Sequence, residues 1–93
     1  MTSLVEGRAL AHVESRNLPQ LAALMRDQHT KGRTQYGHPI DEWPATRRTV
    51  LMEAARELAD LFTYLERAEF DGQAMSYLRV VAVALEAELL ITP

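Results

Sequence analysis

Apolar residues recur along this chain at the three- and four-residue spacings of amphipathic helices. The clearest case lies between Pro44 and Phe70, where nothing breaks a helix. There, five apolar residues follow one another at spacings of 4, 3, 4 and 3: Leu51, Ala55, Leu58, Phe62 and Leu65. The pattern predicts a long helix with one apolar face. It begins at or after Pro44, because a residue before proline avoids helical backbone angles.

Three further helices are predicted, over residues of about 3–14, 18–36 and 73–91. Asn17 offers an N-cap for the second of these, and Gly37 offers a C-terminal cap directly after it. Pro39 then blocks continuation, which leaves a loop over residues 38–44. Four helices without a strand predict an all-α fold, a small four-helix bundle in which residues 1–93 form one domain.

The last predicted helix is apolar on every side in its middle. Val80 to Leu85 is an unbroken apolar run of six residues. A helix that is apolar all round is buried all round, which in so small a domain suggests a partner chain. We therefore predict a homodimer or a higher homo-oligomer, with this helix near the interface. The alternative is a helix at the centre of a monomeric bundle.

Length and composition exclude several classes of protein. With 93 residues the chain has room for one core, and its 47% of hydrophobic residues argues against disorder. The net charge of −3 argues against nucleic-acid binding, which needs a concentrated basic surface. The longest apolar run is too short to span a bilayer, and the N-terminus lacks the apolar core of a signal peptide. We therefore expect a cytoplasmic protein without a membrane or nucleic-acid partner.

An acidic stripe runs along the longest predicted helix. Glu53, Glu57 and Asp60 point the same way, because each helical residue advances by about 100°. Three carboxylates on one face suit a hard cation such as Mg²⁺ or Mn²⁺. The alternative is a solvated charged face, which is common on helices. Arg56 lies one turn before Asp60 and is positioned to pair with it.

Basic residues gather on either side of the loop over residues 38–44. Lys31 and Arg33 precede the loop, and Arg47 and Arg48 follow it. Cations beside an acidic metal site are what a polyphosphate substrate requires. The alternative for Lys31 is a surface ion pair with Asp27, one turn earlier.

The order of these features resembles a known family. Residues 31–37 read Lys-Gly-Arg-Thr-Gln-Tyr-Gly, a proline-containing loop follows, and residues 56–60 then read Arg-Glu-Leu-Ala-Asp. A Tyr-Gly helix end followed by such an acidic motif resembles the MazG-like proteins of the all-α nucleoside triphosphate pyrophosphatase superfamily. The likeness is greatest to the short members found in phages and actinobacteria, and it covers residues 28–67.

The resemblance implies a fold, an activity and roles for particular residues. It implies a four-helix arrangement assembled as dimers or tetramers, and metal-dependent hydrolysis of a nucleoside triphosphate to a nucleoside monophosphate and pyrophosphate. The cofactor would be Mg²⁺, with Mn²⁺ as an alternative. The metal ligands and catalytic residues would be Glu53, Glu57 and Asp60. The substrate contacts would come from Lys31, Arg33 and Tyr36, although Tyr36 could instead fill a core.

The chain departs from the family pattern in two places. Arg56 stands where the family often has an acid, and the preceding helix lacks the Glu-x-x-Glu pair of fuller members. A fourth carboxylate would have to come from Asp27, Asp41 or Glu42, or from another subunit. These departures leave a second interpretation open: a non-catalytic helical oligomer of the same fold that binds a nucleotide or a protein.

Overall fold

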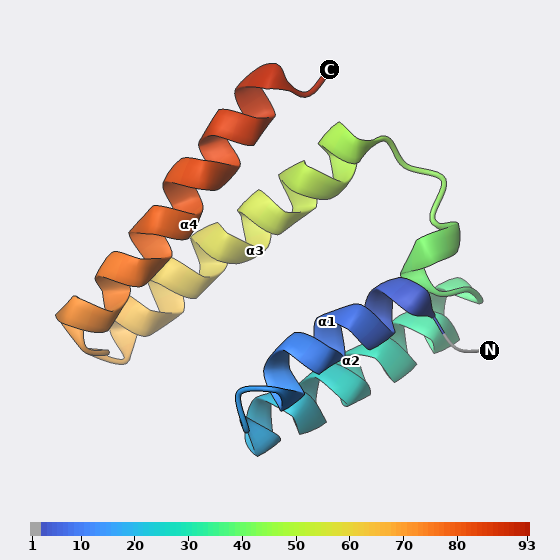
Figure 1. The fold of residues 1–93 in the computed structure, drawn as a ribbon, viewed down its shortest axis with the longest axis horizontal. Helices are drawn as coiled ribbons and strands as arrows, with labels where there is room; N and C mark the ends of the chain where they lie inside the picture. Colours follow the sequence, from blue (N-terminus) through green and yellow to red (C-terminus); the bar gives the residue numbers. More distant parts are fainter. Residues whose placement is uncertain (1–2) are drawn as a thin grey trace. The chain divides into compact units, whose positions relative to one another are not determined.

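The computed structural model describes residues 3–93, and the regular structure in that range is entirely helical (Figure 1). Its elements, in chain order, are α1 (Leu4–Glu14), α2 (Pro19–Tyr36), the short 3-10 helix η1 (Ile40–Glu42), α3 (Arg47–Arg67) and α4 (Gly72–Ile91). The predicted all-α class with four helices is confirmed. The chain divides into two compact units, one ending at Pro44 and the other beginning at Ala45. None of the described helices combines the length and the apolar character needed to cross a membrane.

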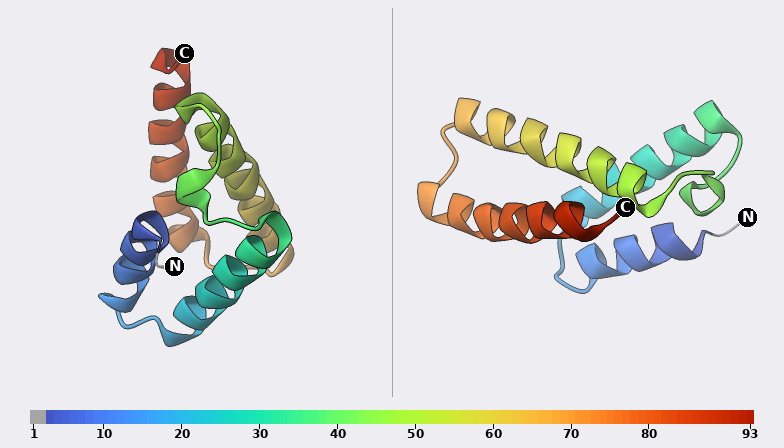
Figure 2. Two further views of the ribbon diagram at one scale, coloured as in Figure 1. Left: turned by 90° about the vertical axis from the view of Figure 1, so that its right-hand side faces the viewer. Right: turned by 90° about the horizontal axis from the view of Figure 1, so that it is seen from above.

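The first unit is a hairpin of α1 and α2, which lie side by side in Figures 1 and 2. Ser3 caps α1, because its side-chain oxygen accepts a hydrogen bond of 3.0 Å from the backbone N–H of Glu6. The predicted N-cap at Asn17 is wrong. The N-cap of α2 is Leu18, without a side-chain bond, while Asn17 has a left-handed φ of 56° in the turn between the helices. Asparagine tolerates that conformation better than most residues, which explains why it stands there.

Gly37 ends α2 as predicted. Its φ is 75°, in the left-handed region, and its N–H donates a bond of 2.8 Å to the carbonyl of Arg33. α2 runs without interruption through Gly32. The interior of this hairpin is small, with Val13 and Ala22 as its buried apolar side chains among the described residues.

The second unit is a hairpin of α3 and α4, which also lie side by side. α3 is shorter at both ends than the predicted stretch and begins three residues after Pro44, where Thr46 caps it through the N–H of Thr49 at 3.2 Å. Asp71 caps α4 by accepting a bond of 2.9 Å from the N–H of Gln73. The starts of α3 and α4 thus each have a side-chain oxygen that satisfies one of the free N–H groups of the helix.

The core of the second unit lies between the apolar faces of its two helices. All five members of the apolar pattern on α3 are partly buried. On α4, buried and partly buried side chains recur at spacings of 3, 4, 3 and 4: Met75, Leu78, Ala82, Leu85 and Leu89. This set is called the inner row of α4. Its spacing is that of a helix side packed against one neighbouring helix.

Candidate functional site

The three acids predicted to bind metal lie on one side of α3, and two of them have free carboxylates. Glu57 and Asp60 are exposed, and neither forms a hydrogen bond or an ion pair with any residue in the range 3–93. Glu53 is different, because it accepts a close hydrogen bond from the guanidinium of Arg56. The predicted pairing of Arg56 with Asp60 is therefore wrong. It leaves Asp60 free and neutralises part of the charge of Glu53.

The chemistry of these oxygen ligands fits a hard divalent cation. Within the described residues, no three Asp, Glu or His side chains converge in a cluster that could hold a metal ion. Mg²⁺ does not require such a cluster, because it is commonly bound by one or two carboxylates, with water and substrate phosphate filling the other positions. Glu57 and Asp60, adjacent on one face, are the pair that matches this requirement.

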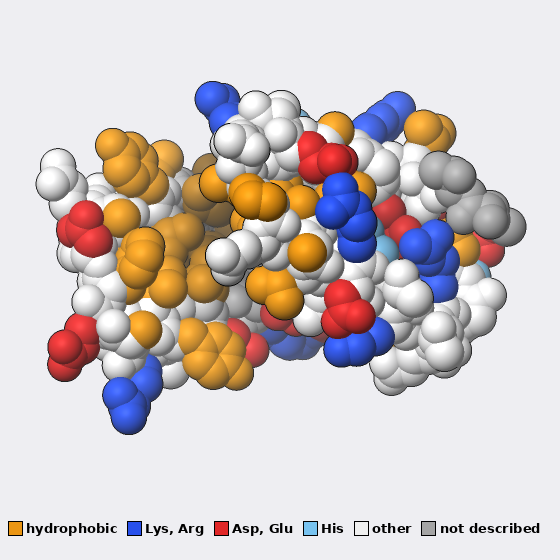
Figure 3. All heavy atoms as spheres, turned by 90° about the horizontal axis from the view of Figure 1, so that it is seen from below, with side chains coloured by type: hydrophobic (Ala, Val, Ile, Leu, Met, Phe, Trp, Pro, Cys, Tyr) orange, Lys and Arg blue, Asp and Glu red, His pale blue; other side chains and the backbone are white. Residues whose placement is uncertain are grey.

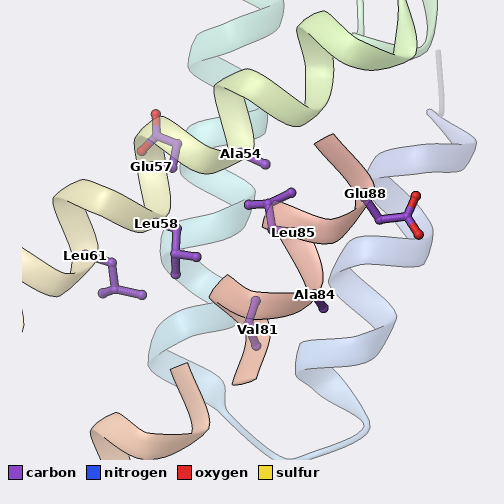
Figure 4. A pocket seen from close by; sticks show the side chains of 8 residues that line it. All are labelled: Ala54, Glu57, Leu58, Leu61, Val81, Ala84, Leu85 and Glu88. Atoms are coloured by element: carbon purple, nitrogen blue, oxygen red, sulfur yellow. The ribbon is translucent and has the colours of Figure 1, made fainter. Parts of the chain in front are cut away.

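An open groove between α3 and α4 has Glu57 at its edge (Figure 4). Its volume is about 540 Å³, and most of its lining is apolar. The lining residues are Ala54, Glu57, Leu58, Leu61, Val81, Ala84, Leu85 and Glu88. Figure 4 shows the carboxylates of Glu57 and Glu88 at opposite edges of the groove, pointing away from one another. The groove therefore offers an apolar surface with an acid at each edge, and not a shared site for one cation.

The predicted substrate contacts lie in the first unit, on the C-terminal half of α2. The ammonium of Lys31 pairs with Asp27 at 2.9 Å on the surface, as the alternative interpretation of this residue expects. Arg33 lies 3.7 Å from the carboxylate of Glu6, whose side chain is 10% exposed. Tyr36 is 66% exposed and does not fill a core. Lys31 and Arg33 thus already pair with acids. Asp27, the partner of Lys31, is exposed and is easier to replace by another anion than Glu6 is.

Arg47 and Arg48 have a structural role that the sequence did not suggest. Arg48 donates to the carbonyl oxygens of Leu89 and Thr92, at 2.7 and 3.0 Å. Arg47 donates to the hydroxyl of Thr92 at 2.7 Å and to the carboxylate of Glu88 at 3.1 Å. Carbonyls at a helix end need donors, and α4 has no basic residue in its own last turn. Because the last turn of α4 contains no basic residue, the sequence could have suggested that another helix supplies donors to these carbonyls.

Asp41 joins η1 to the first turn of α1. Its carboxylate accepts a close hydrogen bond from the hydroxyl of Ser3 and one of 3.0 Å from the N–H of Val5. The Ser3 bond first, and then the Val5 bond, hold the pKa of the Asp41 carboxyl below its ordinary value. Asp41 is thus occupied within the first unit. Of the three proposed sources of a fourth carboxylate, Glu42 alone has no bonded partner among the described residues.

Comparison with known proteins adds no assignment to this geometry. No protein-family model, curated protein or solved structure matches the chain significantly.

Proposed function

We propose that this protein is a metal-dependent nucleoside triphosphate pyrophosphohydrolase that acts as a homo-oligomer. The observation that carries the proposal is the pair of unpartnered carboxylates of Glu57 and Asp60, on the same side of α3. Both carboxylates are exposed, one of them at the edge of an apolar groove, and both are available to take a hard cation. The resemblance of residues 28–67 to MazG-like proteins names the reaction that such a cation would serve.

In this proposal Glu57 and Asp60 hold Mg²⁺ or Mn²⁺. The metal, when bound, polarises the phosphoryl oxygens and lowers the pKa of a bound water. Glu53, one turn before Glu57, is either a third ligand or the group that orients the attacking water. Arg56, bonded to Glu53, limits the negative charge that accumulates on this face.

The resemblance to MazG-like proteins implies that basic side chains of α2 are the phosphate contacts. Lys31 and its partner Asp27 are both well exposed. An exposed ion pair of this kind contributes only about 0–1 kcal/mol, so exchanging the carboxylate for a phosphate costs little. Arg33 adds a planar donor that matches a phosphate. Tyr36, exposed at the end of the same helix, is available to stack on a nucleobase.

The test is pyrophosphate release from a panel of ribo- and deoxynucleoside triphosphates with Mg²⁺ or Mn²⁺. Release is expected from the wild-type protein and should fall at least about 100-fold in Glu57→Gln and Asp60→Asn. Glu66→Gln is the matched control, because Glu66 is another exposed acid of α3, its carboxylate has no bonded partner in the described part of the chain, and it lies off the stripe. Equal release from Glu57→Gln and the control would remove Glu57 from the site.

A non-catalytic helical oligomer is the second candidate. The observation that favours it is the bond of Arg56 to Glu53, together with the lack of a three-acid cluster in the described part of the chain. On this interpretation, a folded and assembled sample releases no pyrophosphate from any nucleotide of the panel. The same panel therefore separates the two candidates.

A further inference from the structure

α4 carries a second apolar row on the side opposite its inner row. Its members are spaced 3, 4, 3 and 4 apart: Tyr77, Val80, Ala84, Ala87 and Ile91. This set is called the outer row. At about 100° per residue, the centres of the two rows lie roughly 200° apart around the helix. The inner row packs in the hairpin, whereas every member of the outer row is exposed. This explains why α4 is apolar all round.

The outer row is large enough to be an interface. Tyr77, Val80 and Ile91 are 73%, 68% and 75% exposed, and Val83 and Leu90 beside them are 70% and 85% exposed. A large apolar side chain carries on the order of 100 Å² of apolar surface, so these residues expose several hundred Å² together. Patches of this size on a small protein mark interaction sites. A stable interface buries about 800 Å² per partner, and these side chains together would supply about half of it. Hydrophobic side chains are visible at the surface of the molecule in Figure 3.

We infer that the outer row of α4 pairs with the outer row of a second copy of this chain, with the two helices antiparallel. Spacings of 3 and 4 residues form the a and d positions of a coiled-coil seam, which is completed by a helix with the same spacing. When Tyr77 of one copy faces Ala87 of the other, the shared seam runs over the 11 residues from Tyr77 to Ala87 and is about 15 Å long. Ala84, near its centre, allows the two helices to approach closely.

No other described helix offers a matching apolar row. On α2, the exposed positions at this spacing begin with the apolar Leu21 and Leu24, but the next three are polar: Gln28, Lys31 and Gln35. α1 is only 11 residues long. The flank of α3 from Val50 to Tyr64 has the right spacing, but the acid Glu57 interrupts it. The outer row of α4 is thus complemented best by itself, as a two-fold symmetric interface requires.

Size and the helix dipoles favour the antiparallel arrangement. With the helices antiparallel, Tyr77 lies opposite Ala87 of the second copy and Val80 lies opposite its Ala84, so large side chains face small ones. Antiparallel pairing also opposes the two helix dipoles. A parallel pair would place each large side chain opposite its own copy and would align the dipoles.

This inference deepens the homo-oligomer part of the proposed function and does not need its catalytic part. Its tests use neither nucleotide nor metal, so a failure here leaves the assay of pyrophosphate release to be judged separately.

The first test measures molar mass by sedimentation over a range of protein concentrations. The wild-type protein should have twice the 10.5 kDa mass of one chain, or an even multiple of it. Val80→Asp should weaken assembly at least about 100-fold, because it buries an unpaired carboxylate at the interface, and Val80 does not line the groove between α3 and α4. Ala59→Asp, at an exposed alanine of α3 away from both rows, should assemble like the wild type. A wild-type protein that stays monomeric overturns the inference. The same result would be obtained if another segment of the same chain covered the outer row, and it would overturn the inference equally.

The second test uses single cysteines, because the chain has none of its own. A mixture of Tyr77→Cys and Ala87→Cys proteins should form a disulfide-linked dimer on mild oxidation, whereas neither should do so alone. Ala59→Cys, the control, should stay unlinked. Disulfides require Cα atoms about 4.4–6.8 Å apart, so the linkage reports the register directly. Linkage of Tyr77→Cys alone would mean parallel helices. That result, or a dimer that links in neither sample, overturns the antiparallel pairing.

Discussion

The guanidinium of Arg48, in the first turn of α3, donates a hydrogen bond of 2.7 Å to the carbonyl of Leu89, near the end of α4. It reaches the carbonyl of Thr92 at 3.0 Å as well. One charged side chain thus satisfies two carbonyls that the helix itself leaves without donors. The bond spans 41 residues of sequence and holds the open end of the α3–α4 hairpin together.

Arg48→Ala should destabilise this hairpin. A hydrogen bond from a charged donor contributes about 1.5–3 kcal/mol, and the solvent access of this one places the expected loss nearer 1–2 kcal/mol. For a chain of this size that corresponds to a melting temperature lower by about 4–15 °C. Thermal unfolding at fixed protein concentration measures the loss. Arg16→Ala, at an exposed arginine without a bonded partner among the described residues, should unfold like the wild type. Equal melting of the two variants would contradict a stabilising cap.

Asp41→Asn should destabilise the first unit more at neutral pH than in acid. The hydrogen bonds from Ser3 and Val5 lower the pKa of the folded carboxyl below the ordinary value of 3.8. The unfolded chain therefore takes up the proton at a higher pH than the folded chain does. Stability from this group is complete well above pH 3.8 and is lost as the pH falls through the folded pKa.

Urea denaturation of the wild type and Asp41→Asn at pH 7 and at pH 3 measures this effect. The difference in unfolding free energy should shrink at the lower pH. Glu42→Gln, at the neighbouring exposed acid, serves as the control. A difference that is independent of pH would show that the charge of Asp41 does not contribute.

The same substitution at two glycines of the α2 region should have opposite effects. Gly32→Ala lies inside α2 with open space around the new methyl group, and should stabilise by about 0.5–1 kcal/mol. Gly37→Ala also meets no neighbour, but its φ of 75° disfavours any residue with a Cβ, and should destabilise by about 1 kcal/mol. Urea denaturation separates them. Changes of the same sign would contradict the left-handed cap at Gly37.

Mg²⁺ or Mn²⁺ should raise the melting temperature if Glu57 and Asp60 hold the metal. A ligand at 100 times its dissociation constant stabilises the native state by about 2.7 kcal/mol. The shift seen in the wild type should disappear in the double variant Glu57→Gln/Asp60→Asn and should persist in Glu66→Gln. A metal-induced shift of equal size in all three proteins would place the cation elsewhere, and no shift in any of them would favour the solvated-face interpretation.

Local sequence rules predicted the features that depend on neighbouring residues. The 4-3-4-3 pattern around Leu58 identified α3, and Gly37 marked the end of α2, because periodicity and backbone freedom act within a few residues. Asn17 shows the limit of such rules, since the same residue type suits both an N-cap and a left-handed turn position. Local rules also could not predict whether Arg56 pairs with Glu53 or with Asp60, because both acids are within its reach on the same helix.

Features that depend on distant segments could not be predicted locally. Arg48 was noted only as one of the basic residues beside the loop, because nothing near it in sequence reveals the carbonyls of α4 that it binds. The apolar character of α4 was interpreted as burial on all sides, whereas only the inner row is packed in the hairpin. The pattern of α4 fixes its two rows, but not what covers the outer one. The three acids of α3 were identified from spacing, yet their use as metal ligands remains a prediction.

Packing between helices that follow one another in sequence, α1 with α2 and α3 with α4, also affects the kinetics of folding. Such hairpins have low contact order, and helical domains of low contact order fold in microseconds to milliseconds. The outer row of α4 would therefore be fully formed before two chains meet. Assembly would then be a separate bimolecular step whose rate rises with protein concentration, and in a dilute sample this step would be the slow one.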